Sequence, residues 1–126
     1  MPQTAIRVYR HISGEVPLSD WLSELKELNP RAYAKCLARI QLLGQYGYEL
    51  RRPIADTLRD GIYELRAKDR HVNYRILYFF CGQSIVCLSH GFTKEDEIPD
   101  AEIDSAITRM KLVEKNIGRF TVEWER

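Results

Sequence analysis

Two arginines, Arg66 and Arg75, are the residues of this 126-residue chain whose type and spacing most directly indicate chemistry. They lie in two neighbouring runs rich in Ile, Val, Tyr and Phe, which predict strands over 61–68 and 72–80. The two runs are separated by a short polar link, so a hairpin is the simplest connection. If its turn is centred on Arg70-His71, then Arg66 and Arg75 lie directly opposite each other.

Two opposed guanidinium groups repel each other unless an anion lies between them. Glu64 is diagonal to Arg75 in this register, so one interpretation is a surface ion cluster that contributes only to structure. The other interpretation is a site for an external phosphate, since guanidinium groups stay charged and bind phosphate in a bidentate way. Local features alone do not overturn the structural interpretation, which is the commoner one for charged residues on strands.

The same register predicts which face of the hairpin is buried, because side chains alternate along a strand. A shift by one residue would mix charges into the apolar face, which argues against it. We expect the apolar face to carry the core and the other face to carry the charges. The predicted core face has Tyr63, Leu65, Ala67, Tyr74, Ile76, Tyr78 and Phe80, and the opposite face has Ile62, Glu64, Arg66, Lys68, Asn73, Arg75, Leu77 and Phe79.

The segments before this hairpin predict one strand and two helices. Thr4–His11 alternates as a half-buried strand does. The spacing of Leu and Trp predicts a helix over Pro17–Leu28. Asn29-Pro30 then caps a second helix that runs to about Gln45, so the two helices form a hairpin.

The segments after it complete a single α+β domain over residues 1–126, with a core at about 4–118 and the order β-α-α-β-β-β-α. Residues 48–60 predict an irregular connection, and 84–92 predict a third strand of an antiparallel meander. Pro99 opens a last helix, for which Gly118 is a plausible stop. Alternating apolar residues in the tail, 119–126, could add a short strand.

Composition limits the class of protein. The hydrophobic fraction of 44% and the charged fraction of 29% are typical of a globular domain. No apolar run reaches membrane-spanning length and the first residues lack a signal-peptide core, so we expect a cytoplasmic protein without membrane contact. Three cysteines, Cys36, Cys81 and Cys87, match no zinc spacing. We therefore expect reduced, buried thiols, with no metal and no cofactor.

Charge is unevenly distributed although the net charge is only +1. Residues 51–94 contain eight Lys or Arg and four Asp or Glu, whereas residues 95–104 contain six acids and no base. This pattern predicts a polarised surface. By itself it does not show nucleic-acid binding.

The element order and three motifs together resemble a known family, the RelE/HigB-type toxins of bacterial toxin–antitoxin pairs, particularly the phage-derived HigB-like branch of the RelE/ParE superfamily. The resemblance covers roughly Thr4 to Lys115. Its motifs are Asp60-Gly61-Ile62-Tyr63-Glu64-Leu65-Arg66, Tyr74-Arg75-Ile76-Leu77-Tyr78-Phe79-Phe80, and His90-Gly91-Phe92-Thr93-Lys94.

This resemblance implies a twisted antiparallel sheet with helices on one face and an mRNA interferase that cuts messages in the ribosomal A site. It also implies a helix-turn-helix antitoxin as partner. The family's functional positions match Arg66, Arg75 and Lys94. The family commonly has a second lysine after the first, whereas here Lys94 is followed by Glu95-Asp96-Glu97.

Cleavage of RNA by its own 2′-hydroxyl needs a group that takes the 2′ proton, cations that stabilise the phosphorane, and an acid for the 5′ oxygen. Arg66 and Arg75 suit the electrostatic role, and Lys68 and Lys94 could assist. His90 could transfer protons or could equally be a structural residue. His71 and Tyr74 are further candidates for proton transfer. If the substrate is RNA, as the resemblance implies, the candidates for contacting it are Arg51, Arg52, Lys68, Arg70, His71, Asn73 and Tyr74. The alternatives are a ParE-like toxin that binds DNA gyrase without catalysis and an inactive prophage-derived homologue that only binds antitoxin.

Overall fold

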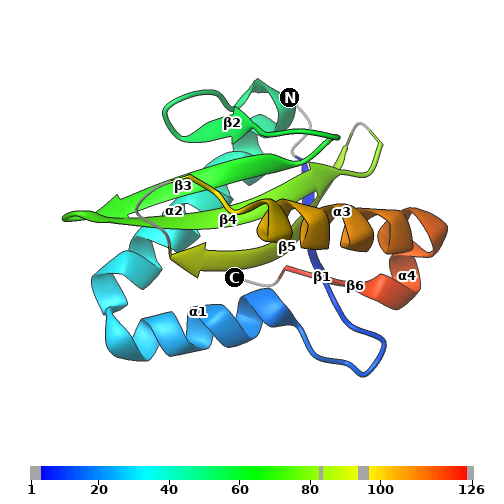
Figure 1. Ribbon diagram of the computed structural model, residues 1–126, viewed down its shortest axis with the longest axis horizontal. Coiled ribbons are helices and arrows are strands. Elements are labelled where there is room, and N and C mark those ends of the chain that lie inside the picture. The colour runs from blue at the N-terminus through cyan, green and yellow to red at the C-terminus, as the bar shows by residue number, and fades with distance from the viewer. Residues whose placement is uncertain (1–3, 83, 94–96, 125–126) are drawn as a thin grey trace.

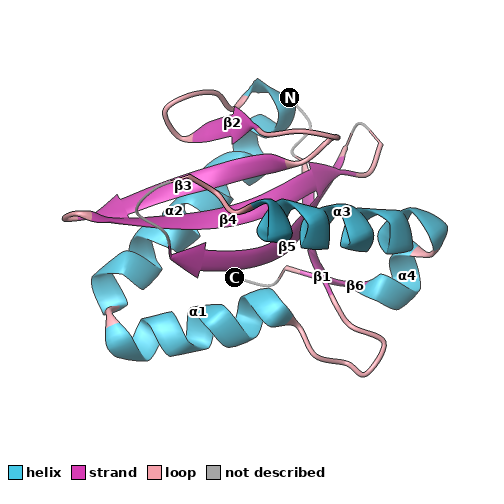
Figure 2. Ribbon diagram, viewed as in Figure 1, coloured by secondary structure: helices cyan, strands magenta, loops and turns pink. Residues whose placement is uncertain are grey.

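The computed structural model describes residues 4–82, 84–93 and 97–124. They form one α+β domain, as predicted, in which a sheet of six strands carries helices on both faces (Figure 1). Figure 2 shows the two layers of helices on either side of the strands. The elements in chain order are β1 (Ala5–Tyr9), α1 (Pro17–Leu28), α2 (Pro30–Tyr46), the 3₁₀ turn η1 (Gly47–Glu49), β2 (Ala55–Thr57), β3 (Tyr63–Asp69), β4 (Val72–Phe80), β5 (Ile85–Thr93), α3 (Asp100–Lys115), α4 (Ile117–Phe120) and β6 (Thr121–Glu123).

The strand order is β2-β3-β4-β5-β1-β6, and the predicted meander β3-β4-β5 forms its centre. The β3–β4 register is the predicted one, with Arg66 opposite Arg75. Arg70 has a φ of 58°, a left-handed conformation that suits the tight turn between the strands. The strand β1 is parallel to β5, which is possible because the helical hairpin separates β1 from the meander in the chain.

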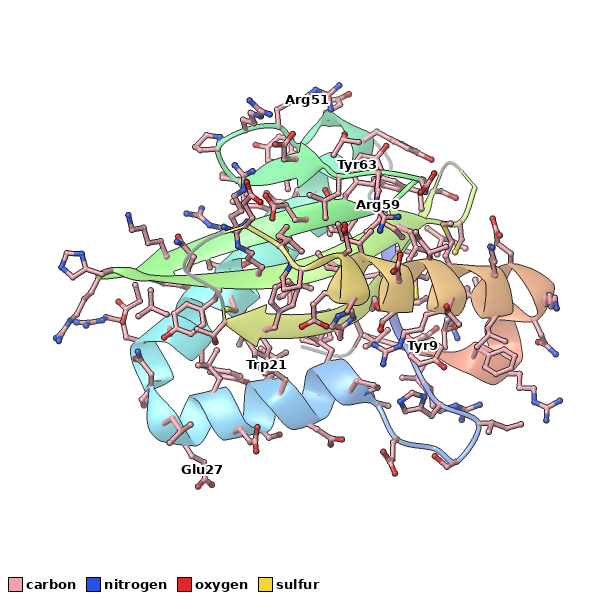
Figure 3. All side chains as sticks on the ribbon, viewed as in Figure 1. Tyr9, Trp21, Glu27, Arg51, Arg59 and Tyr63 are labelled. Atoms are coloured by element: carbon pink, nitrogen blue, oxygen red, sulfur yellow. The ribbon has the colours of Figure 1, made fainter. Side chains whose placement is uncertain are left out.

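The helical hairpin packs on the predicted core face. Leu18 and Leu22 of α1 are buried against a cluster that includes Leu65, Ile76 and Tyr78. Figure 3 shows Trp21 between α1 and the sheet. A Cβ atom at Gly91 would lie 2.3 Å from the Trp21 ring, so glycine is required there for α1 to approach β5 this closely.

The opposite face has its own core beneath α3. Ile103 and Ala106 of this helix pack in one cluster with Ile62, Leu77 and Phe79. The resemblance had implied helices on one face, whereas here α3 covers half of the second face. Figure 1 shows the turn end of β3 and β4 extending beyond α3. We call this end of β3 and β4 the uncovered end because α3 does not reach it, and it is where the register places Arg66 and Arg75.

Two details differ from the expectations. The segment expected to be irregular contains η1 and the short strand β2, which pairs with β3. Gly118 does not stop α3: the helix ends at Lys115 with Asn116 as its C-cap, and Gly118 lies within α4. The expected tail strand is present as β6, because Val122 pairs with Val8.

All three cysteines are free thiols. Cys36 and Cys87 are buried, and Cys81 is half-buried. Burial raises the pKa of Cys36 to about 12, so this thiol stays protonated and unreactive near neutral pH. Among the described helices, none combines the length and apolar character needed to cross a membrane.

Candidate functional site

The centre of the candidate site is a carboxylate held between two arginines. Glu64 is only 1% exposed, although it is charged. Its Oε2 accepts a hydrogen bond of 2.6 Å from Nη1 of Arg75, and its Oε1 accepts one from Nε of Arg66. The anion that the sequence required between the opposed arginines is therefore present within the chain. It fixes the orientation of both guanidinium groups.

A second carboxylate extends this network towards the edge of the sheet. Asp56 Oδ2, on β2, accepts from Nη2 of Arg66 at 3.1 Å and from Nε of Arg52 at 3.0 Å. The hydrogen bond from Arg52 is the largest cause that holds the pKa of Asp56 below its ordinary value. Three guanidinium groups and two carboxylates thus form one connected cluster, Arg75–Glu64–Arg66–Asp56–Arg52, with a net charge of +1.

The two central arginines differ in exposure. The Arg66 side chain is 37% exposed, whereas the Arg75 side chain is 15% exposed. A phosphate that approaches the uncovered end of the sheet would meet Arg66 first and Arg75 beneath it. The cluster therefore places one accessible, oriented guanidinium group, that of Arg66, over a largely buried one, that of Arg75. Electrostatic stabilisation of a phosphorane requires such oriented charge.

The turn between the two arginine-bearing strands is held against the helical hairpin by hydrogen bonds to one carboxylate. Asp69, at the end of β3, is 3% exposed. Its carboxylate accepts hydrogen bonds from Asn29 at 3.0 Å, Arg31 at 2.8 Å and Lys35 at 3.1 Å. Asn29 also caps α2, since its side chain accepts from the Ala32 amide. The hydrogen bond from Asn29, followed by those from Lys35 and Arg31, lowers the pKa of Asp69 to about 2.

His90 lies on the same face of the sheet as the arginines but beneath α3. It is opposite Leu77 and 8% exposed. Its Nδ1 is 2.7 Å from Oγ of Ser89 and its Nε2 is 3.2 Å from Oε1 of Glu102. Burial, with a smaller contribution from Arg109, lowers the pKa of His90 against the opposing effect of Glu102. The ring is thus engaged at both nitrogens and favours the neutral form.

The remaining predicted RNA contacts fall into two groups. Lys68 and Asn73 are opposite each other in the β3–β4 register, on the arginine-bearing face, and the exposed Arg70 and His71 form the turn. Tyr74 is not part of this surface, because it is 7% exposed and packs near Trp21 on the helical-hairpin face. Side chains alternate along β4, so Tyr74 points to the core face, as predicted, and Arg75 points to the opposite face.

Arg51 lies on the loop before β2 rather than on the sheet, and its Nη1 donates to the carbonyl oxygen of Tyr48. Lys94 lies outside the described residues, as do Glu95 and Asp96, whereas Glu97 is exposed.

Two residues that hold the candidate site in place were not identified from the sequence. Asp56 was assigned to an irregular loop, and only its pairing with Glu64 across β2 and β3 brings it to Arg66. Asp69 was assigned to a turn, and its partners are about 35–40 residues away in the chain, on the helical hairpin. Alternation of Ala55 and Thr57 around Asp56 was the only local signal for the extra strand.

Within the described ranges, no three His, Cys, Asp or Glu side chains gather as metal ligands. In a comparison with protein-family models, residues 23–111 match the family described as phage derived protein Gp49-like (DUF891). The chain therefore belongs to the Gp49-like family, which is part of the RelE/ParE-like toxin superfamily. No curated protein matches the chain at a significant level.

Proposed function

We propose that this Gp49-like protein is the toxin of a toxin–antitoxin pair and that it cleaves mRNA on the ribosome as a HigB-like, metal-independent endoribonuclease. Membership of the Gp49-like family is consistent with a toxin. The observation that carries the proposed chemistry is the Arg66–Glu64–Arg75 arrangement on the uncovered end of the sheet.

In this proposal the RNA 2′-hydroxyl attacks the adjacent phosphorus and gives its proton to His71, the exposed turn histidine that remains a candidate for this transfer. The bond from phosphorus to the 5′ oxygen breaks, and the 5′ oxygen takes up a proton. Arg66 and Arg75 stabilise the negative charge that grows on the phosphorane oxygens. Lys68 lies two residues along β3 from Arg66 on the same face, and its ammonium group suits protonation of the departing 5′ oxygen. Lys94, which matches the first lysine of the family's motif, remains the sequence-based candidate for a further cation.

His90 has a supporting rather than a catalytic place in this proposal. Its Nε2 contacts Glu102 of α3, and its ring lies 5.9 Å from that of Phe92. Phe92 is opposite Arg75, so the packing of His90 supports the strand position next to this arginine. We therefore favour the structural alternative for His90 over proton transfer.

We propose a helix-turn-helix antitoxin as the partner that keeps the toxin silent. The uncovered end of the arginine-bearing face is the surface it must block or reshape. An acidic or amphipathic segment fits this surface because the arginine cluster carries a net positive charge.

A non-catalytic function is the second candidate, and one observation favours it. Both central guanidinium groups already have carboxylate partners within the chain, and acidic residues 95–97 follow Lys94 where the family commonly has another lysine. These features suit a ParE-like toxin that binds DNA gyrase, or a homologue that only binds antitoxin.

Induced expression in a bacterial host separates the two candidates. Primer extension on cellular mRNA should reveal discrete cleavages after induction of the parent protein and none after induction of Arg66→Ala/Arg75→Ala. Lys111→Ala, at an exposed position of α3, serves as the matched control and should cleave like the parent. Growth arrest without cleavage, accompanied by loss of DNA supercoiling activity, would contradict the nuclease and support the gyrase candidate.

A further inference from the structure

A pocket of about 480 Å³ opens at the edge of the sheet formed by β2, beside the arginine cluster. Its volume lies within the range of roughly 300–1,000 Å³ that is typical of small-ligand sites. Figure 3 shows Arg51 and Tyr63, two residues of its wall, on the β2 side of the molecule. The pocket combines aromatic, cationic and hydroxyl groups and is lined by Tyr48, Leu50, Arg51, Arg52, Ala55, Asp56, Thr57 and Tyr63.

Its aromatic wall is held in place by stacking. The Tyr63 ring stacks on Tyr78 at 5.4 Å between centroids and meets Phe80 edge-on at 5.2 Å. The Tyr48 ring stacks on Phe80 at 3.7 Å, and its hydroxyl donates to the carbonyl oxygen of Gly82 at 2.8 Å. Tyr48 is nevertheless 45% exposed. The two tyrosines therefore present oriented aromatic surface to the pocket, at little entropic cost on binding.

Its cations are also oriented. Arg51 donates to the Tyr48 carbonyl oxygen, so this guanidinium lies on the same loop as the aromatic wall. Arg52 pairs with Asp56 at 2.9 Å and is 76% exposed, which leaves most of its side chain accessible to a ligand. Asp56 itself already accepts from Arg52, Arg66 and the Thr57 amide. Its negative charge is thus largely offset.

The pocket is continuous with the candidate catalytic surface through Asp56. This residue lines the pocket and accepts a hydrogen bond of 3.1 Å from Arg66. A row of cationic side chains therefore crosses the β2 edge, from the pocket to the uncovered face of the sheet. In spatial order these are Arg51, Arg52, Arg66 and Arg75. Aromatic rings beside such a row are the combination by which proteins bind single-stranded nucleic acid.

We propose that this pocket binds one nucleotide of a single-stranded RNA, adjacent to the phosphate held by Arg66 and Arg75. The base lies against Tyr63, and the phosphate contacts Arg51 and Arg52. The proposal rests on the proposed function for its substrate class. Stacking and phosphate contacts do not distinguish bases, and Asp56 is occupied by its own donors, so the subsite tolerates any base.

The test is a titration of the ¹⁵N-labelled full chain with a fully 2′-O-methylated hexanucleotide, which cannot be cleaved through its 2′ oxygens. The amide signals of Leu50, Ala55 and Thr57 should shift at saturation. Tyr63→Leu should weaken binding about 5- to 100-fold through loss of stacking, and Tyr63→Phe should bind like the parent. Arg51→Ala should lower the slope of log affinity against log salt by about 0.7, and Lys111→Ala should not.

The outcomes separate this proposal from the proposed function. If RNA shifts these amides but no message is cleaved in cells, the subsite stands and the nuclease is wrong. If messages are cleaved but RNA shifts only amides of β3 and β4, the subsite is wrong and the nuclease stands. If an oligoglutamate peptide shifts the pocket amides and RNA does not, the pocket is an acidic-protein site and the proposal is overturned.

Discussion

Glu64 and Arg75 form a buried ion pair, with Oε2 and Nη1 2.6 Å apart, although Glu64 faces Leu77 rather than Arg75 in the strand register. The diagonal geometry lets the same carboxylate reach Arg66 along its own strand. One buried anion thus relieves the repulsion between two opposed arginines, of which Arg66 is the more exposed.

The first prediction concerns this carboxylate. Glu64→Gln should lower the free energy of unfolding by about 2 kcal/mol, because it leaves two guanidinium groups without their shared anion. The loss is smaller than the roughly 3–5 kcal/mol of a fully buried pair, since Arg66 is 37% exposed and partly screened by water. Urea denaturation measures the change. Asp104→Asn, which removes an exposed partner of Arg59, is the control and should change stability by less than about 1 kcal/mol.

The second prediction concerns acid stability. The pKa of Asp69 is lowered to about 2, so its ionised form stabilises the fold above the ordinary pKa of 3.8. That contribution is lost as the pH falls from about 4 through 2, where the folded state takes up the proton. Asp69→Asn should therefore be less stable than the parent at pH 7 and should lose less stability over this window. Parallel curves for the two proteins between pH 5 and 2 would contradict the assignment.

The third prediction concerns His90. Burial lowers its pKa, so the ring should be neutral at pH 7 and its NMR titration midpoint should lie below the ordinary value of 6.5. Because the unfolded chain binds this proton more tightly, the folding stability should fall as the pH drops below about 6.5. His90→Gln should reduce this dependence. If His90→Gln abolishes cleavage while unfolding and RNA affinity are unchanged, then proton transfer by His90 would replace the structural role.

The fourth prediction concerns the partner. Co-expression with the adjacent reading frame should yield a complex that survives purification and restores growth, since a toxin must be held silent in its host. Charge reversal on the uncovered turn end, by Lys68→Glu or Arg70→Glu, should weaken the binding of an acidic antitoxin. Lys111→Glu on α3 should weaken this binding less. A purified monomer that neither slows growth nor binds the neighbouring product would favour an inactive relic.

The local pattern of apolar and polar residues was sufficient to predict the central part of the fold. Period-two alternation and a two-residue turn determine the register of β3 and β4, because any slip would bury charge. The boundaries of α1 follow from Pro17 and the leucine spacing and agree with the structure. The same logic predicted that Glu64 would be diagonal to Arg75.

The rest depended on contacts between segments far apart in the chain. Asp56 reaches Arg66 only because a three-residue strand pairs at the edge, and three residues carry almost no periodic signal. Asp69 is anchored by residues of α2 that no spacing rule connects to a β-turn. The position of α3 on the second face depends on the packing of Ile103 and Ala106 against strand residues distant in the chain. Arg59, which pairs with Asp104 at 2.8 Å and lies above α3 in Figure 3, adds an exposed contact.

The central claim is that Arg75 stabilises charge in the transition state of RNA cleavage. The most direct measurement is single-turnover cleavage of message on programmed ribosomes by the parent, Arg75→Ala and Arg75→Lys, together with ribosome affinity. We predict that Arg75→Ala cleaves about 10²–10³-fold more slowly at nearly unchanged affinity and that Arg75→Lys recovers only part of the rate, since an ammonium lacks the planar fork. An Arg75→Ala protein that remains folded and cleaves at the parent rate would contradict the claim.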